Sequence, residues 1–220
     1  MLDPQGALPR YLRTPDRRYW SEEIPELDAI YVQINTVRDE QDGPTLGAFL
    51  DDVVATVREK QTQNAIVDLR LNPGGDYTKS AAFTKSLPAV LPPDGRLFIL
   101  TSGNTFSAAI VTAARLKYFG GERALIVGEP MGDREQFWGE GRNIFLPNSG
   151  LQVGYATAAH DWEKGCDLSH IRTCFYVNYV LGVAAGKLMP DLAIVPSFAD
   201  YSRGEDTVLN AVAADLAKLN

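Results

Sequence analysis

The sequence predicts an α/β domain built on a mainly parallel sheet. Short apolar runs at 29–34, 64–70, 96–101 and 124–127 are typical of strands buried on both faces. Helical stretches with apolar residues three and four positions apart, such as 46–57, separate these runs. Because strands and helices alternate, successive strands are expected to lie parallel, joined by right-handed crossovers. A chain of 220 residues that is 45% hydrophobic can bury one substantial core.

The N-terminal part departs from this alternation. Residues 1–27 are rich in proline and arginine, and we interpret them as an extended lead-in that ends a missing upstream region. The core domain is then expected to span residues 28–220. The helix that follows the strand at 64–70 is expected to end at Pro88, since proline removes a helical hydrogen bond.

The C-terminal part also changes character. Residues 143–146 and 151–156 predict a β-hairpin joined by a turn at 147–150. Residues 175–185 fit either a strand or a helix. Further on, a proline begins an expected edge strand at 190–195, and apolar residues of helical spacing predict a closing helix at 206–219.

Charge and composition exclude several classes of function. The net charge of −7 is spread along the chain without a basic run, so nucleic acid is not an expected partner. No stretch approaches eighteen consecutive apolar residues, so no membrane span is predicted in this chain. The first residues also lack the basic start and apolar stretch of a signal peptide.

The redox state of two cysteines bears on the cellular compartment of the protein. Cys166 and Cys174 are the only cysteines, with seven residues between them. A disulfide would indicate an extracytoplasmic protein, whereas two reduced cysteines are the alternative. His160 and His170 lie nearby, but their spacing fits no standard zinc finger, and no metal site is predicted.

One strand–turn–helix junction carries a candidate nucleophile. Ser107 follows the strand at 96–101 and is expected in the first turn of a helix capped by Asn104 or Thr105. Free backbone N–H groups and the positive end of the helix dipole lie at this position. A serine that only caps or packs is the alternative interpretation.

A second junction follows the strand at 64–70, in the run Asn72-Pro73-Gly74-Gly75. Paired glycines allow positive φ angles and can turn backbone N–H groups into open space. Because the carboxyl ends of parallel strands meet at one sheet edge, the two junctions are expected to line one crevice. One junction could supply a nucleophile and the other an oxyanion hole. A plain tight turn is the alternative.

Together these motifs resemble the C-terminal processing (tail-specific) proteases, with their tricorn-core and retinoid-binding relatives. The matching segments occur in the family's order, at 68–75, 105–109, 127–130, 146–151 and 190–191. The resemblance implies a ClpP/crotonase-like α/β spiral with a C-terminal β-hairpin region. It also implies a serine peptidase that needs no cofactor and acts on a peptide or protein.

The resemblance assigns roles to individual residues. Ser107 is the expected nucleophile, and the N–H groups of Gly74, Gly75 and Ala108 are the expected oxyanion hole. The expected substrate cleft is lined by Asn72, Thr105, Phe106, Glu129 and Arg134. Asp68 and Arg70 are expected to form a structural pair at the strand end.

The general base of the family is missing from its usual place. Arg134 stands where the processing proteases have a lysine, and arginine does not give up its proton in proteins. Tricorn-like members use an early histidine and a late glutamate, but no histidine precedes Ser107 and residues 186–189 contain no glutamate. The base could come from upstream sequence, or from His160 oriented by Asp161 or Glu163.

The sequence therefore favours a serine peptidase domain of the tricorn-like, non-lysine branch. A catalytically inactive domain that binds a peptide or hydrophobic ligand in the same cleft is the alternative, and acyl-CoA chemistry of the crotonase type is a third. An upstream domain of the same protein is the expected partner, and a homo-oligomer is compatible with the sequence. Family habit and a potential disulfide suggest a periplasmic or secreted location.

Overall fold

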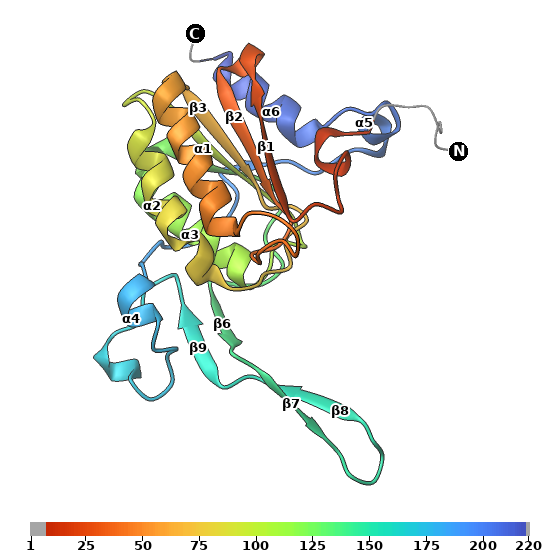
Figure 1. Ribbon diagram of the computed structural model, residues 1–220, viewed down its shortest axis with the longest axis vertical. Coiled ribbons are helices and arrows are strands. Elements are labelled where there is room, and N and C mark those ends of the chain that lie inside the picture. Colours follow the sequence, from red (N-terminus) through yellow and green to blue (C-terminus); the bar gives the residue numbers. More distant parts are fainter. Residues whose placement is uncertain (1–7, 219–220) are drawn as a thin grey trace.

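A six-stranded sheet forms the centre of the protein (Figure 1), in a computed structural model that describes residues 8–218. The strand order is β1-β2-β3-β4-β5-β10. All neighbours pair in parallel except β1 and β2. The predicted mainly parallel α/β sheet is confirmed, with β1 (Tyr19–Ile24), β2 (Ala29–Ile34), β3 (Asn64–Asp68), β4 (Leu97–Thr101), β5 (Ala124–Gly128) and β10 (Leu192–Ala193).

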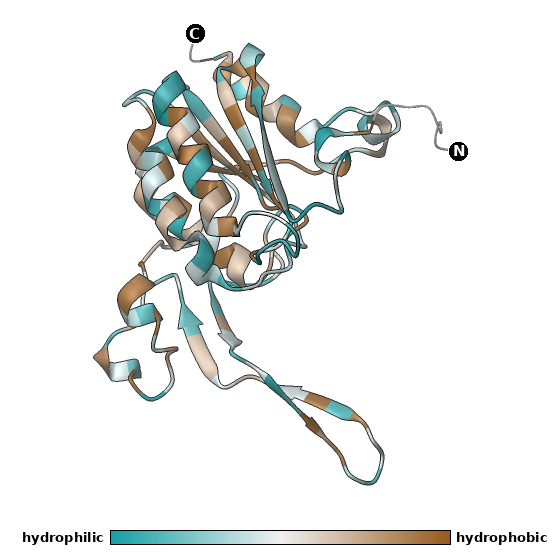
Figure 2. Cartoon of the chain, in the orientation of Figure 1, coloured by the Kyte–Doolittle hydropathy of each residue, from teal (hydrophilic) through white to brown (hydrophobic). Residues whose placement is uncertain are grey.

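Helices cover both faces of this sheet. Three helices lie together on one face, and one helix lies on the other (Figure 1), so that two hydrophobic clusters enclose the strands. Figure 2 shows the apolar colouring concentrated on the inner strands. The three are α1 (Leu46–Lys60), α2 (Ala81–Val90) and α3 (Ala108–Gly120), and the fourth is α6 (Thr207–Leu216).

Local sequence explains where α1 begins and ends. The Thr45 side chain accepts a hydrogen bond from Ala48 N–H, and Gln61 ends the helix in the left-handed conformation. The apolar positions of α1 face the core, as their spacing predicts. The expectation that Pro88 ends its helix is wrong, because Pro88 lies inside α2, which continues to Val90.

Short helices complete the chain. They are η1 (Arg10–Leu12), η2 (Pro25–Leu27), η3 (Tyr77–Ser80), η4 (Gly121–Arg123), η5 (Leu168–His170), α4 (Asn178–Leu181) and α5 (Phe198–Ser202). The segment 175–185, which fitted a strand or a helix, contains only the single turn of α4. Among the described residues, no helix is both long enough and apolar enough to span a membrane.

The N-terminal segment differs from the predicted lead-in. Residues 19–24 form β1, the edge strand of the main sheet, in a six-residue antiparallel register with β2. Tyr19 and Ile24 are buried in the core. The local sequence does not reveal this strand, because it lacks an apolar run and its pairing depends on the strand beside it. The expectation of an upstream region stays a prediction.

A long hairpin projects from the body below α3 (Figure 1). Its base is β6 (Gln136–Gly139) paired with β9 (Ala158–Asp161), and its tip is β7 (Arg142–Phe145) paired with β8 (Gln152–Tyr155). We call residues 142–155 the β7–β8 arm. The predicted hairpin is therefore confirmed, as are the edge strand after Pro190 and the closing helix, which begins at Asp206 as N-cap.

Asp191 explains why the edge strand lies where it does. Its Oδ2 accepts hydrogen bonds from Ile126 N–H at 2.7 Å and from Lys117 Nζ at 2.8 Å. One carboxylate thus joins the short β10 to β5 and to α3. The Pro-Asp motif has a structural role in this chain.

Candidate active site

Ser107 occupies the sharp turn between β4 and α3. It is the N-cap residue of α3, with φ 53° and ψ −120°, a conformation that residues with a β-carbon rarely adopt. Neither Asn104 nor Thr105 caps the helix, so that expectation is wrong. Ser107 is only half-buried, and its side chain makes no capping hydrogen bond. The turn therefore presents its hydroxyl outward at a strained position, an arrangement found at catalytic serines.

Thr105 is part of the framework under this turn. It is fully buried, its Oγ1 donates to Leu69 O at 2.9 Å, and the same oxygen accepts from Ser102 N–H at 3.0 Å. Thr105 O also accepts from Gly132 N–H. Its expected place in the substrate cleft is therefore wrong, because its side chain points into the protein and stabilises the serine turn.

Asn72 joins the two turns that the sequence singled out. Its Nδ2 donates to Ile34 O at 2.8 Å, its Oδ1 accepts from Gly74 N–H at 2.9 Å, and its backbone oxygen accepts from Phe106 N–H at 3.0 Å. The side chain is completely buried. Asn72 therefore positions the glycine turn against the serine turn and does not line the cleft.

Among the described residues, one of the two glycine N–H groups that were expected to be oxyanion donors is already hydrogen-bonded. The N–H of Gly74 is already bonded to Asn72 Oδ1, which argues against its expected role. In the described part of the chain, the N–H groups of Gly75 and Ala108 have no hydrogen-bond acceptor. Gly75 has φ 143°, and Ala108 begins α3. These two groups are the free donors beside Ser107.

An open cleft of about 480 Å³ connects these features. Phe106, one of the expected cleft residues, is 44% exposed and lies in its lining. The lining of the cleft consists of Arg18, Thr36, Arg38, Pro73, Gly74, Gly75, Phe106 and Ser107. Within the described residues, this lining holds no histidine, lysine or carboxylate that could take the proton of Ser107.

Glu129 and Arg134 lie outside this cleft. Glu129 N–H donates to Thr101 O at 3.1 Å, and its carbonyl accepts from Thr101 Oγ1 at 2.8 Å, so the residue fixes the loop after β5. Arg134 is exposed, and its backbone N–H bonds to Asp133. Their expected contribution to the cleft is not seen in the lining residues.

His160 is buried among aromatic side chains, where it is not placed to act as a base. Its ring stacks on Phe137 with centroids 4.9 Å apart, and Asn178 Nδ2 lies 3.1 Å from its Nδ1. Its Nε2 lies 3.5 Å from Glu140 Oε1, and the side chain is almost fully buried. Burial lowers the pKa of His160 to about 4. The structure does not bring His160 into the cleft of Ser107.

The two expected orienting acids serve other partners. Asp161 accepts hydrogen bonds from Gln136 Nε2 at 3.0 Å and from Lys164 N–H at 2.8 Å. Glu163 accepts Gly186 N–H through its backbone oxygen. Neither side chain contacts a ring nitrogen of His160 in the described residues.

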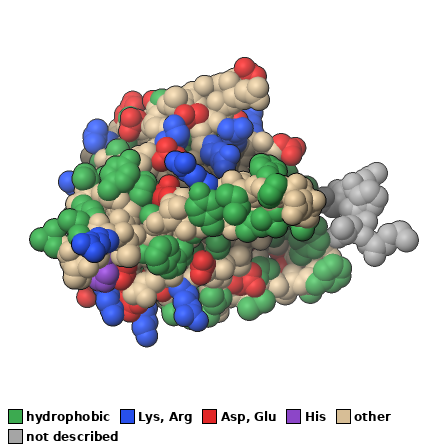
Figure 3. All heavy atoms as spheres, turned by 90° about the horizontal axis from the view of Figure 1, so that it is seen from below, with side chains coloured by type: hydrophobic (Ala, Val, Ile, Leu, Met, Phe, Trp, Pro, Cys, Tyr) green, Lys and Arg blue, Asp and Glu red, His purple; other side chains and the backbone are tan. Residues whose placement is uncertain are grey.

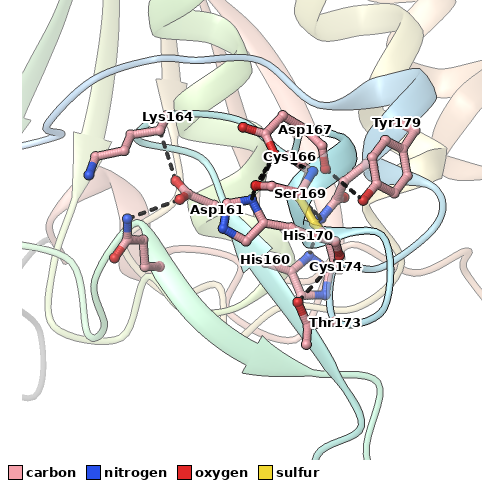
Figure 4. The surroundings of a disulfide bond; sticks show 12 residues. His160, Asp161, Lys164, Cys166, Asp167, Ser169, His170, Thr173, Cys174 and Tyr179 are labelled. Carbon is pink, nitrogen blue, oxygen red and sulfur yellow. Dashed lines mark hydrogen bonds and ion pairs between the residues drawn. A yellow bond between two sulfur atoms is a disulfide. The ribbon is translucent and has the colours of Figure 1, made fainter.

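Cys166 and Cys174 form a disulfide close to His160 (Figure 4). Of the two alternatives for the cysteines, the structure therefore contains the oxidised pair. His170 is exposed, with Nδ1 3.1 Å from Asp167 Oδ1. Among residues 8–218, no group of three or more His, Cys, Asp or Glu side chains is arranged to hold a metal ion.

A buried ionic network lies beside the cleft, at the carboxyl end of β3. Arg70 Nη2 lies 2.5 Å from Asp68 Oδ2 and 2.7 Å from Asp206 Oδ2, and Tyr31 OH donates to Asp68. Burial alone would lower the pKa of Arg70, but Asp68 and Asp206 raise it well above its usual value. The expected structural pair of Asp68 and Arg70 is confirmed, with the cap of α6 as a third member.

Three residues of the cleft, Arg18, Thr36 and Arg38, were not expected from the sequence. Arg38 stands four residues after the end of β2, and Arg18 stands just before β1. The position of Arg38 after a parallel strand was a usable signal, since side chains there gather at the same sheet edge. No such signal existed for Arg18, because β1 was not recognised.

A larger hollow of about 730 Å³ lies at the opposite end of the sheet. Its lining includes Gln63, Asn64 and Arg96, which precede or begin β3 and β4. Ligand sites in open parallel sheets gather at the carboxyl ends of strands. We therefore place the candidate site at Ser107.

No model of a protein family matches the sequence, and no curated protein matches it either. Solved structures of S41 peptidases nevertheless share its fold. A protein from Parabacteroides merdae described as a candidate peptidase has a TM-score of 0.58 at 16% identity, with 90% of this chain and 64% of that chain covered. CPAF, solved with lactacystin, has a TM-score of 0.60 at 13% identity, with 87% and 52% covered.

The same fold also occurs in a lipoprotein from Streptococcus agalactiae, with a TM-score of 0.54 at 13% identity and 93% and 71% of the two chains covered. The chain thus spans about half to two thirds of the length of the two peptidase structures. Identities this low show a common fold.

Proposed function

We propose that this chain is a serine peptidase domain that hydrolyses peptide bonds through an acyl-enzyme on Ser107. One observation carries the proposal. Ser107 stands in a strained turn at the N-terminus of α3, beside the backbone N–H groups of Gly75 and Ala108, which have no acceptor among residues 8–218. The fold shared with S41 peptidases supports it.

The reaction follows from this arrangement. Ser107 Oγ would attack the carbonyl carbon of the peptide while a base takes its proton. The N–H groups of Gly75 and Ala108 would donate to the oxyanion, and each such donor lowers the barrier by about 3 kcal/mol in related sites. The C–N bond then breaks with proton transfer to the leaving amine, and water hydrolyses the ester.

The general base must come from outside the residues around Ser107. The cleft lining offers two guanidinium groups, which stay protonated, and no group that titrates near neutral pH. We infer that an upstream region of the same protein supplies the base, one of the two sources that the sequence left open. His160 would have to leave its aromatic surroundings and its bond with Asn178 to serve.

Labelling with a fluorophosphonate probe tests the proposal. The chain is compared with Ser107→Ala, first alone and then together with any coding sequence that precedes it. Labelling that is lost in Ser107→Ala and appears only with the longer protein is the expected result. Absence of labelling in both lengths, with circular dichroism showing an intact fold, would refute the peptidase proposal.

A binding domain without turnover is the second candidate. The lack of a base in the cleft favours it, and one neighbour of the same fold is a lipoprotein rather than a named peptidase. In that case the cleft would hold a peptide without cleaving it. Peptide binding with no labelling of the longer protein would distinguish this function from the first.

We also propose an extracytoplasmic location. The bond between Cys166 and Cys174 supports it, because disulfides persist mainly in oxidising compartments. Free-thiol titration of the protein isolated from its native cell, under alkylating conditions, tests this proposal. Two titratable thiols would contradict it.

A further inference from the structure

Two arginines stand at the cleft and have no part in the reaction described above. Arg38 and Arg18 line the same hollow as Gly75 and Ser107. Among residues 8–218 they are its only charged lining residues, in a chain whose net charge is −7. The cleft, where a substrate would bind, therefore carries positive charge, opposite in sign to the net charge of the chain.

The backbone holds Arg38 against the glycine turn. Val37 forms a parallel bridge with Gly75, donates its N–H to Gly74 O at 2.9 Å and accepts from Asp76 N–H at 2.8 Å. The Arg38 Cγ lies 3.1 Å from the position that a β-carbon on Gly75 would occupy. The Arg38 side chain therefore leaves the backbone directly beside Gly75.

The charge of Arg38 has no carboxylate partner within residues 8–218, whereas the acids next to it are engaged. Asp39 Oδ2 lies 2.6 Å from Lys79 Nζ, and that hydrogen bond lowers the pKa of Asp39. Glu40 accepts Arg18 N–H at 2.8 Å and lies 3.8 Å from Arg18 Nε. Arg18 is thus partly neutralised, and Arg38 is the cation left for a ligand.

We propose that the cleft selects peptides that carry a carboxylate beside the bond at Ser107, and that Arg38 binds this carboxylate. A guanidinium group presents a planar fork of donors that matches a carboxylate in a bidentate manner. The carboxylate is that of the peptide's C-terminus or of an Asp or Glu side chain. The inference rests on the proposed function only in placing the peptide in this cleft, since binding requires no catalysis.

Peptide titrations monitored by NMR of ¹⁵N-labelled Ser107→Ala protein test the proposal without turnover. The probes are Ac-Ala-Ala-Ala-Ala with a free C-terminal acid, the same peptide as its amide, and Ac-Ala-Ala-Glu-Ala as its amide. Shifts of the Gly75 and Ala108 amides at lower concentrations of an acidic peptide than of the neutral one are expected. Which acidic peptide binds identifies the source of the carboxylate. Equal binding of all three, or no shift with any, overturns the proposal.

The residue is assigned by a second variant on the same background. Arg38→Gln is expected to weaken binding of the acidic peptide about fivefold and to leave binding of the neutral peptide unchanged. A fivefold loss is the scale of one exposed ion pair. Arg17→Gln is the matched control, because Arg17 is exposed, carries the same charge and does not line the cleft. Equal effects of the two variants would show long-range attraction instead of a contact.

These outcomes are separate from the fate of the proposed function. Carboxylate-selective binding, with no fluorophosphonate labelling of either the chain or the longer protein, would leave this inference standing and remove the peptidase. Labelling without any preference for the carboxylate would do the reverse.

Discussion

Gly74 lies directly against Ser107, so that a β-carbon on Gly74 would come within 2.8 Å of the Ser107 Cβ. The same β-carbon would lie 3.2 Å from Ala108 N. The φ angle of Gly74 is 115°, a region that residues with a β-carbon rarely adopt. The serine turn and the glycine turn are therefore one packed unit, although about thirty residues separate them in the chain.

Gly74→Ala is expected to lower the free energy of unfolding by about 2–4 kcal/mol, from the steric overlap and the positive φ. Because the overlap is with Ser107 itself, labelling of that serine in the longer protein should also be lost. Urea denaturation and probe labelling measure the two effects. Gly103→Ala is the control, since a β-carbon there has no neighbour within 4 Å. Equal stability of the two variants would contradict the close contact.

Ser107→Gly is expected to raise the free energy of unfolding by about 1 kcal/mol, because glycine adopts φ 53° and ψ −120° without strain. Ser107→Ala keeps the β-carbon and should show no gain. Both variants lose the hydroxyl, so urea denaturation of the pair separates relief of strain from loss of the side chain. A Ser107→Gly protein no more stable than Ser107→Ala would show that the turn is unstrained.

Arg70→Ala is expected to lower the free energy of unfolding by about 3–5 kcal/mol, because it leaves two buried carboxylates without their cation. Arg203→Ala is the matched control. Arg203 also contacts two carboxylates, those of Asp200 and Glu205, but at the surface, where such pairs contribute less than about 1 kcal/mol. Similar losses in both variants, measured by urea denaturation, would rule out the special role of burial.

His160 is expected to make the protein less stable as the pH falls from about 6.5 to about 4. Its pKa is about 4 in the folded protein, against 6.5 when exposed, so unfolding takes up a proton between these values. The loss amounts to about 3 kcal/mol, given 1.4 kcal/mol for each pH unit. It is complete near pH 4 and absent above pH 6.5.

Denaturation at a series of pH values, with His160→Asn beside wild type, measures this loss. Glu140 also faces His160 and has a raised pKa, from burial and then from Asp76, but it is present in both proteins and cancels in the difference. His170→Asn serves as an exposed histidine control. If the free energy of unfolding depended on pH in the same way in wild type and in His160→Asn, this would contradict a buried neutral ring.

Continuous apolar runs made most of the fold predictable. The strands β2, β3 and β4 are buried along their whole length and are therefore mainly hydrophobic in sequence. In contrast β1, with the sequence YWSEEI, is an edge strand whose exposed positions carry acids. Its place in the sheet depends on β2, which no local pattern reveals.

The candidate site was predictable in its motifs but not in its geometry. The order of motifs pointed to Ser107 and the glycine turn, and both line one cleft. The inward orientation of the Thr105 side chain depends on its hydrogen bond to Leu69 O, and that of Asn72 depends on its hydrogen bond to Ile34 O; both join segments far apart in sequence. Residue type alone could not show that these polar side chains stabilise the framework.

The β7–β8 arm is expected to contribute nothing to the stability of the body. Phe145 and Leu151 are 69% and 64% exposed, and Figure 3 shows hydrophobic side chains open on the face from which the arm projects. The double variant Phe145→Ser/Leu151→Ser should therefore change the free energy of unfolding by less than about 0.5 kcal/mol. Phe137→Ala, at the base of the hairpin, should lower it by about 2–3 kcal/mol, because Phe137 packs on the core and on His160. Thermal and urea denaturation compare the two, and a large loss in the double variant would mean that the arm folds back onto the body in solution.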